Sequence, residues 1–347
     1  MKNRMTARVF CLLAAFLGGC GDIGIFKAIS EETELNSDPS APGNILSIVR
    51  YGDALYAAGG RIYRKDNYTQ KGGWSESSKP DGLVVRLAAG YSGEEYLYAL
   101  TASTGDSGNP TYRLYYFPNA TGDWEKMTDA RLKNLRTIFS NHAAPAEKNR
   151  AYATTSEGVF ELSGGEVAGS VDATDDNGAS SSSVAAAYIG SAEDGATYFA
   201  DTAAFASDGE HLFQGDGTKI SYGADTLSMK EISISGISNT IMSLWAHKTE
   251  ENTGTLYIGT VSGIKTVPYN TATGAPEPYN PATGKPEATS PGNATSTALG
   301  NYEVPAVFVT AGGEAVYAST VGTTATQGTK KNGLWGYYPG RDTWDWE

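Results

Sequence analysis

The sequence predicts an all-β protein made of repeated antiparallel sheets, and three observations lead to this prediction. The 42 Gly residues and the abundant Ser, Thr, Asn and Asp supply turns, whereas 21 Tyr and an aromatic content of 11% supply a core. The apolar stretches are short, as in strands. A triplet with a central aromatic residue also recurs six times, at intervals of 42 to 60 residues. In a chain of 347 residues this period favours one repeated domain.

The first 19 residues have the pattern of an export signal. Residues 2–8 contain three basic residues and no acidic one, and residues 9–17 form an apolar stretch too short to span a bilayer as a helix. This stretch leads into Leu-Gly-Gly-Cys at residues 17–20. The motif resembles the lipobox of bacterial lipoproteins, in which an aliphatic residue and two small residues precede a cysteine. The resemblance implies removal of residues 1–19 and acylation of Cys20, with palmitate as a typical chain.

Lipidation at Cys20 would decide the location of the protein. Each buried methylene contributes about 0.8 kcal/mol, so two or three acyl chains hold a protein stably on a membrane. We therefore expect anchoring to the cell membrane or the outer membrane, facing the periplasm or the cell exterior. Because Cys11 leaves with the signal and Cys20 carries lipid, the mature body has no thiol, which excludes disulfide, iron–sulfur and Cys–zinc chemistry.

The mature chain is strongly acidic. Cleavage after residue 19 removes three basic residues and no acidic one, which changes the formal net charge from −13 to −16. Phosphate backbones and anionic lipid surfaces repel such a body, so we do not expect nucleic acid as a partner. We predict no metal and no cofactor either, because His142, His211 and His247 lie in three different repeats and none pairs with Cys or a second His at metal spacing.

Residues 20–44 are predicted to form a lipidated N-terminus and a flexible tether. Residues 30–44 are acidic, contain proline and have no hydrophobic period, which is typical of a linker.

Residues 45–347 contain the six repeats. Each has an apolar strand, a turn, a strand with the triplet, a loop and a third strand that opens with an aliphatic residue, and several end in tryptophan (Trp74, Trp124, Trp344). The triplets are Leu55-Tyr56-Ala57, Leu97-Tyr98-Ala99, Ala151-Tyr152-Ala153, Tyr198-Phe199-Ala200, Leu256-Tyr257-Ile258 and Val316-Tyr317-Ala318.

Short aromatic-rich strands with a period near 50 residues are typical of β-propeller blades, each a four-stranded antiparallel meander. One blade cannot bury both of its faces, so we expect six blades to pack radially, with the triplet aromatics as core residues between neighbours. A seven-bladed propeller is the alternative. It requires residues 184–232 to divide into two blades at their Asp-Gly turn signals.

The loops between the second and third strands suggest a binding face. The separation between the triplet aromatic and the aliphatic residue of the next strand alternates, at 6, 16, 7, 13, 7 and 17 residues. We expect the long loops 101–110, 201–209 and 320–332 to form a three-fold polar rim, unless they are ordinary tolerated insertions. The candidate binding residues on this rim are Thr104, Asp106, Asn109, Asp201, Phe205, Asp208, Thr323, Gln327 and Lys330.

A tandem duplication follows the fifth triplet. Residues 268–277 (PYNTATGAPE) and 278–287 (PYNPATGKPE) differ at two positions, and the segment 268–298 is rich in Pro, Gly, Ser and Thr. We expect a mobile loop without a strand ladder, on the face opposite the rim. It is either a tolerated slippage product or a partner-binding loop with Tyr269 and Tyr279 as repeated anchors.

No set of residues specifies a reaction. The sequence lacks the G-x-S-x-G elbow, a phosphate-binding glycine loop and H-E-x-x-H. Residues 172–178 (DATDDNG) lack the ligand alternation and the final Glu of an EF-hand loop, which indicates an exposed acidic turn.

We therefore predict no catalytic residues and a protein-interaction scaffold or binding module that contacts another envelope or surface protein. Two alternatives remain open. One is a carbohydrate-active hydrolase or lyase, which needs two carboxylates about 5–9.5 Å apart in one pocket. The other is a sensor of a small ligand or ion, which needs a closed polar pocket at the axis.

Overall fold

The computed structural model describes residues 41, 43–104, 110–118, 122–140, 149–155, 158–170, 204–208, 210–224, 229–277, 279–280, 285–289, 299–300, 302–321, 332–338 and 343–347. All of them belong to one compact unit, Ser40–Glu347. The other unit, Met1–Pro39, contains the predicted signal, Cys20 and most of the predicted tether, and it lies outside the described residues.

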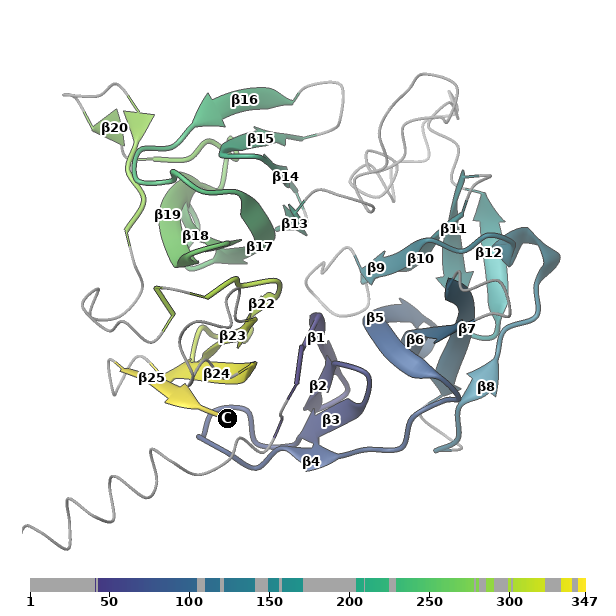
Figure 1. Cartoon of the computed structure of the whole chain (residues 1–347). Helices are drawn as coiled ribbons and strands as arrows, with labels where there is room; N and C mark the ends of the chain where they lie inside the picture. The colour runs from purple at the N-terminus through teal and green to yellow at the C-terminus, as the bar shows by residue number, and fades with distance from the viewer. Residues whose placement is uncertain are drawn as a thin grey trace, which may run out of the picture. The chain divides into compact units, whose positions relative to one another are not determined.

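The described residues form strands, one short 3-10 turn (η1, Ala130–Leu132) and no α-helix. None of them belongs to a helix that is long and apolar enough to cross a membrane. The strands pair antiparallel with their neighbours in sequence, and Figure 1 shows these meanders. The all-β prediction is confirmed.

We number the sheets I to VI in chain order. Sheet I contains β1 (Ser47–Tyr51), β2 (Ala54–Ala58), β3 (Ile62–Lys65) and β4 (Ser75–Glu76); sheet II contains β5 (Leu83–Ser92), β6 (Glu94–Thr104), β7 (Pro110–Pro118) and β8 (Glu125–Lys126). Sheet III contains β9 (Thr137–Ser140), β10 (Ala151–Thr155), β11 (Gly158–Ser163) and β12 (Glu166–Ser170); sheet IV contains β13 (Ala204–Ser207), β14 (Leu212–Asp216), β15 (Lys219–Gly223) and β16 (Lys230–Ser233). Sheet V contains β17 (Ile241–Lys248), β18 (Thr253–Thr260) and β19 (Gly263–Asn270); sheet VI contains β22 (Val307–Val309), β23 (Val316–Thr320), β24 (Gly333–Tyr338) and β25 (Thr343–Trp346). A two-stranded hairpin, β20 (Tyr279–Asn280) and β21 (Lys285–Pro286), follows sheet V.

Strand alternation explains the repeated triplet. Successive side chains of a strand point to opposite faces, so the central aromatic residue lies on one face and its two neighbours lie on the other. In β2, Tyr56 packs in a cluster with sheet II, whereas Leu55 and Ala57 pack with sheet VI. In β23, Tyr317 packs with sheet I, whereas Val316 and Ala318 pack with sheet V. The aromatic of sheet I thus faces the next sheet in the chain and that of sheet VI faces sheet I, whereas in sheet VI the smaller residues face the preceding sheet, V.

The hydrophobic core is divided among the contacts between sheets. Separate clusters join sheets I and II, II and III, IV and V, and V and VI, and a further cluster joins sheet VI to sheet I. The central aromatics Tyr56, Tyr98, Tyr152 and Tyr317 are buried, with at most 6% of each residue exposed. The prediction that the triplet aromatics form core packing is confirmed for these four positions.

The fourth repeat differs from the prediction. The triplet expected at residues 198–200 lies outside the described residues. Leu212 is the aliphatic residue 13 positions after Phe199, which the repeat pattern places at the start of a third strand, but it opens the second strand, β14. Phe213 takes the place of the central aromatic there, because it packs into the cluster shared with sheet V. The error arose because two apolar-aromatic segments lie close together in sequence, and only pairing with β13 and β15 distinguishes them.

The sheets approach one another closely at glycines. A Cβ atom on Gly259 of β18 would lie 2.2 Å from Ser243 Oγ and 2.4 Å from the carbonyl oxygen of Val304, which Ser243 already bonds at 2.8 Å. We expect Gly259→Ala to lower the free energy of unfolding by about 1–3 kcal/mol, because backbone would have to move to make room. Chemical denaturation measures the loss. Gly300→Ala, at a site with no atom within 4 Å, is the matched control, and equal losses for the two would contradict this packing.

The buried tyrosines predict a loss of stability in alkali. Burial raises the pKa of the Tyr98, Tyr152 and Tyr317 hydroxyls above the ordinary value of 10.0. Above about pH 10 these tyrosines ionise in the unfolded chain and stay protonated in the folded one, so the folded chain holds more protons and stability falls as pH rises. We expect the urea midpoint to fall on going above pH 10. Tyrosinate absorbance that develops fully before unfolding would contradict this prediction.

Candidate functional site

The structure describes only part of the predicted rim. In sheet II, Thr104 ends β6 and pairs with Pro110 of β7, so residues 101–104 extend the strand instead of forming a loop. In sheet VI, the ladder between β23 and β24 ends at Thr320 and Gly333. Five candidate residues between these strand ends lie outside the described residues: Asp106, Asn109, Thr323, Gln327 and Lys330. Their role stays a prediction.

The third predicted loop, 201–209, is not a connection between the second and third strands. Phe205 lies in β13, the first strand of sheet IV, and Asp208 lies in the turn that leads to β14. The second and third strands, β14 and β15, are joined by a tight turn in which Asp216 pairs with Lys219 and Gly217 adopts a φ of 55°. The expected three-fold alternation of long loops is therefore wrong in sheet IV, because it followed from the misplaced triplet. Asp201 lies outside the described residues.

Asp208 is a buried structural carboxylate. Its Oδ1 accepts hydrogen bonds from the backbone N–H groups of Glu210 at 2.9 Å and His211 at 2.7 Å, while its Oδ2 accepts one from the Tyr269 hydroxyl at 3.1 Å and lies 3.4 Å from His211 Nδ1. Burial alone would raise the pKa of Asp208, but these bonds from His211 and Glu210 hold it below its usual value. The side chain is fully covered, so it fixes the β13–β14 turn and is not available to a partner.

The tandem duplication forms two successive hairpins, in contrast to the mobile loop predicted. In the first copy, Tyr269 bridges Pro276, and in the second copy Tyr279 pairs with Pro286 at the same relative position. Residues 286–289 then bond on both sides: Ser235 N–H donates to the Pro286 carbonyl at 2.8 Å, and Thr266 and Thr289 exchange two backbone hydrogen bonds. The segment takes the fourth-strand position beside β19. Proline is tolerated here because each ladder is short and the proline carbonyls still accept hydrogen bonds.

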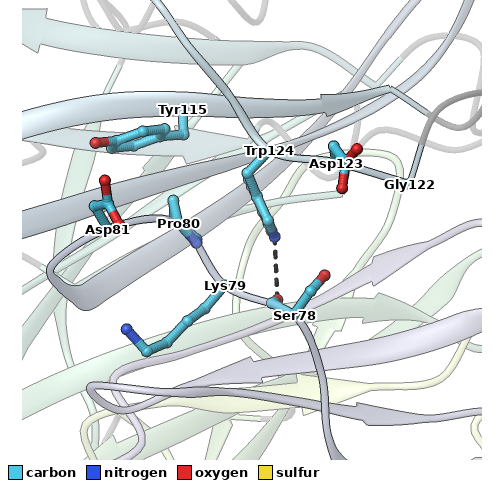
Figure 2. Close-up of a pocket in the computed structure, with 8 residues that line it drawn as sticks. All are labelled: Ser78, Lys79, Pro80, Asp81, Tyr115, Gly122, Asp123 and Trp124. Atoms are coloured by element: carbon cyan, nitrogen blue, oxygen red, sulfur yellow. Dashed lines mark hydrogen bonds between the residues drawn. The ribbon is translucent and has the colours of Figure 1, made fainter.

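A pocket of about 310 Å³ lies between the β4–β5 connection on one side and strand β7 with the β7–β8 connection on the other (Figure 2). The connection contributes residues 78–81, and sheet II contributes Tyr115 and residues 122–124. Trp124 donates a hydrogen bond from Nε1 to the Ser78 carbonyl at 3.0 Å, which joins the two walls. Figure 2 shows Trp124 directed toward Ser78, with Tyr115 and Asp81 on one side of it and Asp123 on the other.

Apolar and charged groups are separated in this pocket. Pro80 and Tyr115 are buried and Trp124 is half-buried, whereas Lys79, Asp81 and Asp123 are exposed. Such a pocket can hold a small ligand by ring contact and by charge, and Asp81 and Asp123 are the two carboxylates among its lining residues. Sequence reasoning noted Trp124 only as the end of a repeat. The sequence signal for this pocket was the Gly-Asp-Trp turn at residues 122–124, which follows the long β6–β7 hairpin. This turn does not reveal that residues 78–81 form the opposite wall of the pocket.

No metal centre is present in the part of the chain that the structure describes, since no three His, Cys, Asp or Glu side chains gather there. His211 is held by Asp208, and burial lowers the pKa of His247, which lies beside Gly313 and near Glu314.

Comparison with known proteins places part of the chain beside bacterial lipoproteins. Residues 2–122, which include the predicted signal, sheet I and strands β5–β7, match the TP013X lipoprotein family. Two uncharacterized lipoproteins of Treponema pallidum (strain Nichols) are 36% identical over 104 residues and 30% identical over 100 residues. These matches cover 28% and 29% of this chain and 21% and 22% of the relatives. A third Treponema pallidum lipoprotein is 24% identical over 164 residues, or 42% of this chain and 41% of its own.

The chain thus spans about a fifth of the length of the first two curated relatives. Among solved structures, the tricorn protease matches 87% of this chain and 26% of its own chain, with 12% identity and a TM-score of 0.48. The similarities to the family and to the curated relatives support a bacterial lipoprotein, in agreement with the signal pattern at residues 1–20.

Proposed function

We propose that the protein is a lipid-anchored six-bladed β-propeller that acts as a binding module or protein-interaction scaffold of the bacterial envelope or surface. Residues 1–19 are the signal peptide, residues 20–44 the lipidated tether and residues 45–347 the propeller. The anchor is the acylated Cys20, which the Leu-Gly-Gly-Cys motif and the lipoprotein similarities support.

One observation carries the propeller: sheets I and VI share a core cluster although they lie at opposite ends of the chain. Their first strands, β1 and β22, are in contact, as are the first strands of sheets I and II, II and III, IV and V, and V and VI. First strands that meet from sheet to sheet, with the last sheet returning to the first, are typical of propeller blades and support this proposal. The segment between sheets III and IV, residues 171–203, lies outside the described residues. The six triplets of the sequence and the six sheets formed by the described residues are the basis for proposing six blades, with seven blades as the alternative.

The binding role is supported by the pocket at Trp124 and by the polar sequences that connect β6 to β7 and β23 to β24. Such connections on a rigid scaffold commonly carry contacts to a partner. We propose another envelope or surface protein as that partner.

Capture from crosslinked envelopes tests this role. The bait is the full lipidated protein, and the variant has residues 105–109 and 322–331 shortened; residues 201–209 stay intact because β13 belongs to the sheet. We expect a specific protein to be recovered with the wild type and lost with the variant. Recovery that is equal for the two proteins would exclude these loops as the contact surface.

The anchor is tested separately. We expect Cys20→Ser to abolish labelling by a palmitate analogue and to move the protein from the membrane fraction to the soluble fraction, because no acyl chain remains to hold it. Cys11→Ser, a change within the signal peptide itself, should leave both the labelling and the membrane fraction unchanged. A Cys20→Ser protein that is still labelled would contradict the assignment of the lipidated residue.

A second candidate function, hydrolysis of an envelope carbohydrate, is favoured by the two carboxylates Asp81 and Asp123 in one pocket. This function requires release of reducing sugar from isolated envelope glycan by the wild type and not by Asp81→Asn or Asp123→Asn.

A further inference from the structure

The pocket at Trp124 has unbalanced negative charge. Two carboxylates, Asp81 and Asp123, and one ammonium group, Lys79, line it. The Lys79 Nζ donates to the Gly82 carbonyl of its own turn at 3.1 Å, so this cation is held by its own turn. Neither Asp81 nor Asp123 forms an ion pair with any residue that the structure describes. A cation that enters the pocket therefore meets two carboxylates that form no ion pair with the described residues.

One wall of the pocket is the Trp124 side chain, which is held in place so that its indole ring faces a ligand. The indole N–H of Trp124 is occupied by the Ser78 carbonyl, and Phe117 packs against the indole with ring centroids 5.1 Å apart. With its N–H occupied, Trp124 offers a ligand its π surface instead of a hydrogen-bond donor. An indole face is the best aromatic partner for an organic cation, and carboxylates beside it add to the attraction.

Charge and size narrow the ligand class. An acid or a phosphate would be repelled by the two carboxylates and by a chain whose formal net charge is −13. A volume of about 310 Å³ is at the small end of the range for ligand sites, which suits a compact group and not an extended chain.

We propose that this pocket binds an alkylammonium group at the face of Trp124, attracted by the negative charge of Asp81 and Asp123. The inference rests on the proposed role as a binding module and specifies the chemistry of one contact. A quaternary ammonium headgroup and a lysine side chain of a partner protein both carry this group.

The test titrates the full lipidated protein in nonionic detergent with two probes, choline chloride and Nα-acetyl-lysine amide, and follows tryptophan fluorescence. The uncharged control is 3,3-dimethyl-1-butanol, which has the shape of choline and lacks its charge; sodium chloride controls for ionic strength. We expect a saturable response to at least one cationic probe and none to the neutral isostere. Stronger binding of choline indicates a headgroup as the source, and stronger binding of the lysine derivative indicates a protein side chain.

Variants assign the response to the pocket. Asp81→Asn and Asp123→Asn keep shape and remove charge, and each should weaken binding roughly fivefold, the equivalent of about 1 kcal/mol. Trp124→Leu should abolish binding, whereas Trp124→Phe keeps a ring and should retain part of it. Lys219→Met, which removes a charge on sheet IV, should change nothing. Equal responses to choline and its isostere, or unchanged affinity in both Asp variants, would overturn the proposal.

The outcome is separable from that of the capture experiment. If choline or the lysine derivative binds and no protein is captured, the ligand class stands and the proposed protein partner fails. If a partner is captured through the loops and neither probe binds, only the ligand class fails.

Discussion

Replacing Lys65 by methionine is expected to lower the free energy of unfolding by about 3–5 kcal/mol, the loss typical of a buried ion pair that is left with one charge. Lys65 Nζ lies 2.6 Å from Glu347 Oε2, and both side chains are completely covered. The ammonium group also donates to the Gly72 carbonyl and lies 5.7 Å and 5.5 Å from the ring centroids of Trp74 and Tyr317. Methionine fills the same space but leaves the Glu347 carboxylate without its cation.

The size of this effect follows from the position of the pair. Glu347 also accepts hydrogen bonds from Trp74 Nε1 at 3.0 Å, from the Gly72 N–H at 3.0 Å and from the Tyr338 hydroxyl at 2.6 Å. Residues of sheet I and of the β3–β4 connection thereby hold Glu347, which directly follows β25 of sheet VI. The network joins the first and last sheets of the described chain, and an uncompensated charge there destabilises both.

Two further variants test whether the unpaired charge of Glu347 causes the loss of stability in Lys65→Met. Lys65→Met/Glu347→Gln removes both charges and keeps an oxygen acceptor, so it should recover much of the stability that Lys65→Met loses. Lys219→Met breaks a pair of the same 2.6 Å length that lies on the surface, and it should have no measurable effect. Urea unfolding at neutral pH measures all three. A loss in Lys65→Met no larger than in Lys219→Met would contradict a buried ion pair at this position.

Replacing Tyr269 by alanine is expected to cost about 3–5 kcal/mol, because it empties a large side-chain site in the core. Tyr269 is 1% exposed, and its ring meets the ring of Phe213 of sheet IV edge to face at a centroid distance of 4.9 Å. Gly254 lies directly beneath the ring, where a Cβ atom would be 2.2 Å from Tyr269 Cζ. Tyr269→Phe keeps the ring and removes one hydrogen bond to the buried Asp208, for an expected loss of about 1–3 kcal/mol.

The duplication provides the matched variant for this prediction. Tyr279 occupies the place of Tyr269 in the second copy, but its strand β20 has two residues, whereas Tyr269 lies in the ladder of β18 and β19 opposite Gly254. We therefore expect Tyr279→Ala to lower the urea midpoint less than Tyr269→Ala does. Equal losses for Tyr269→Ala and Tyr279→Ala would contradict the interpretation that the tyrosine of the first copy contributes more to the core than that of the second. The two copies have the same sequence pattern and unequal structural roles, which the pattern alone does not reveal.

Much of the fold was predictable because its signals are local. Tyr56 and Tyr317 have small or aliphatic neighbours on both sides, and strand alternation turns that pattern into one aromatic face and one compact face. The six triplets thus predicted repeated sheets that are buried on two sides. The fourth repeat failed because two apolar-aromatic segments compete there, and pairing of β14 with β13 and β15, which is not local, decides between them.

The candidate site was far less predictable. Asp208 has the composition of a polar loop residue, yet it is buried by Tyr269, 61 residues later in the chain. The proline-rich duplication has the composition of a mobile loop, yet Ser235 and Thr266 pair with it from both sides. Trp124 ends a repeat, and its pocket exists because Ser78 to Asp81 lie across from it.

The sequence by itself determined the export and lipidation pattern, the acidic body, the all-β class and the alternation that buries the triplets, since each of these depends on residue type and on spacing along a short segment. Only the tertiary structure decided the register of the fourth sheet, the pairing of Lys65 with Glu347 and the pocket at Trp124. These three features depend on groups that are distant in sequence. Such groups stabilise one another only after the neighbouring sheets have brought them into contact.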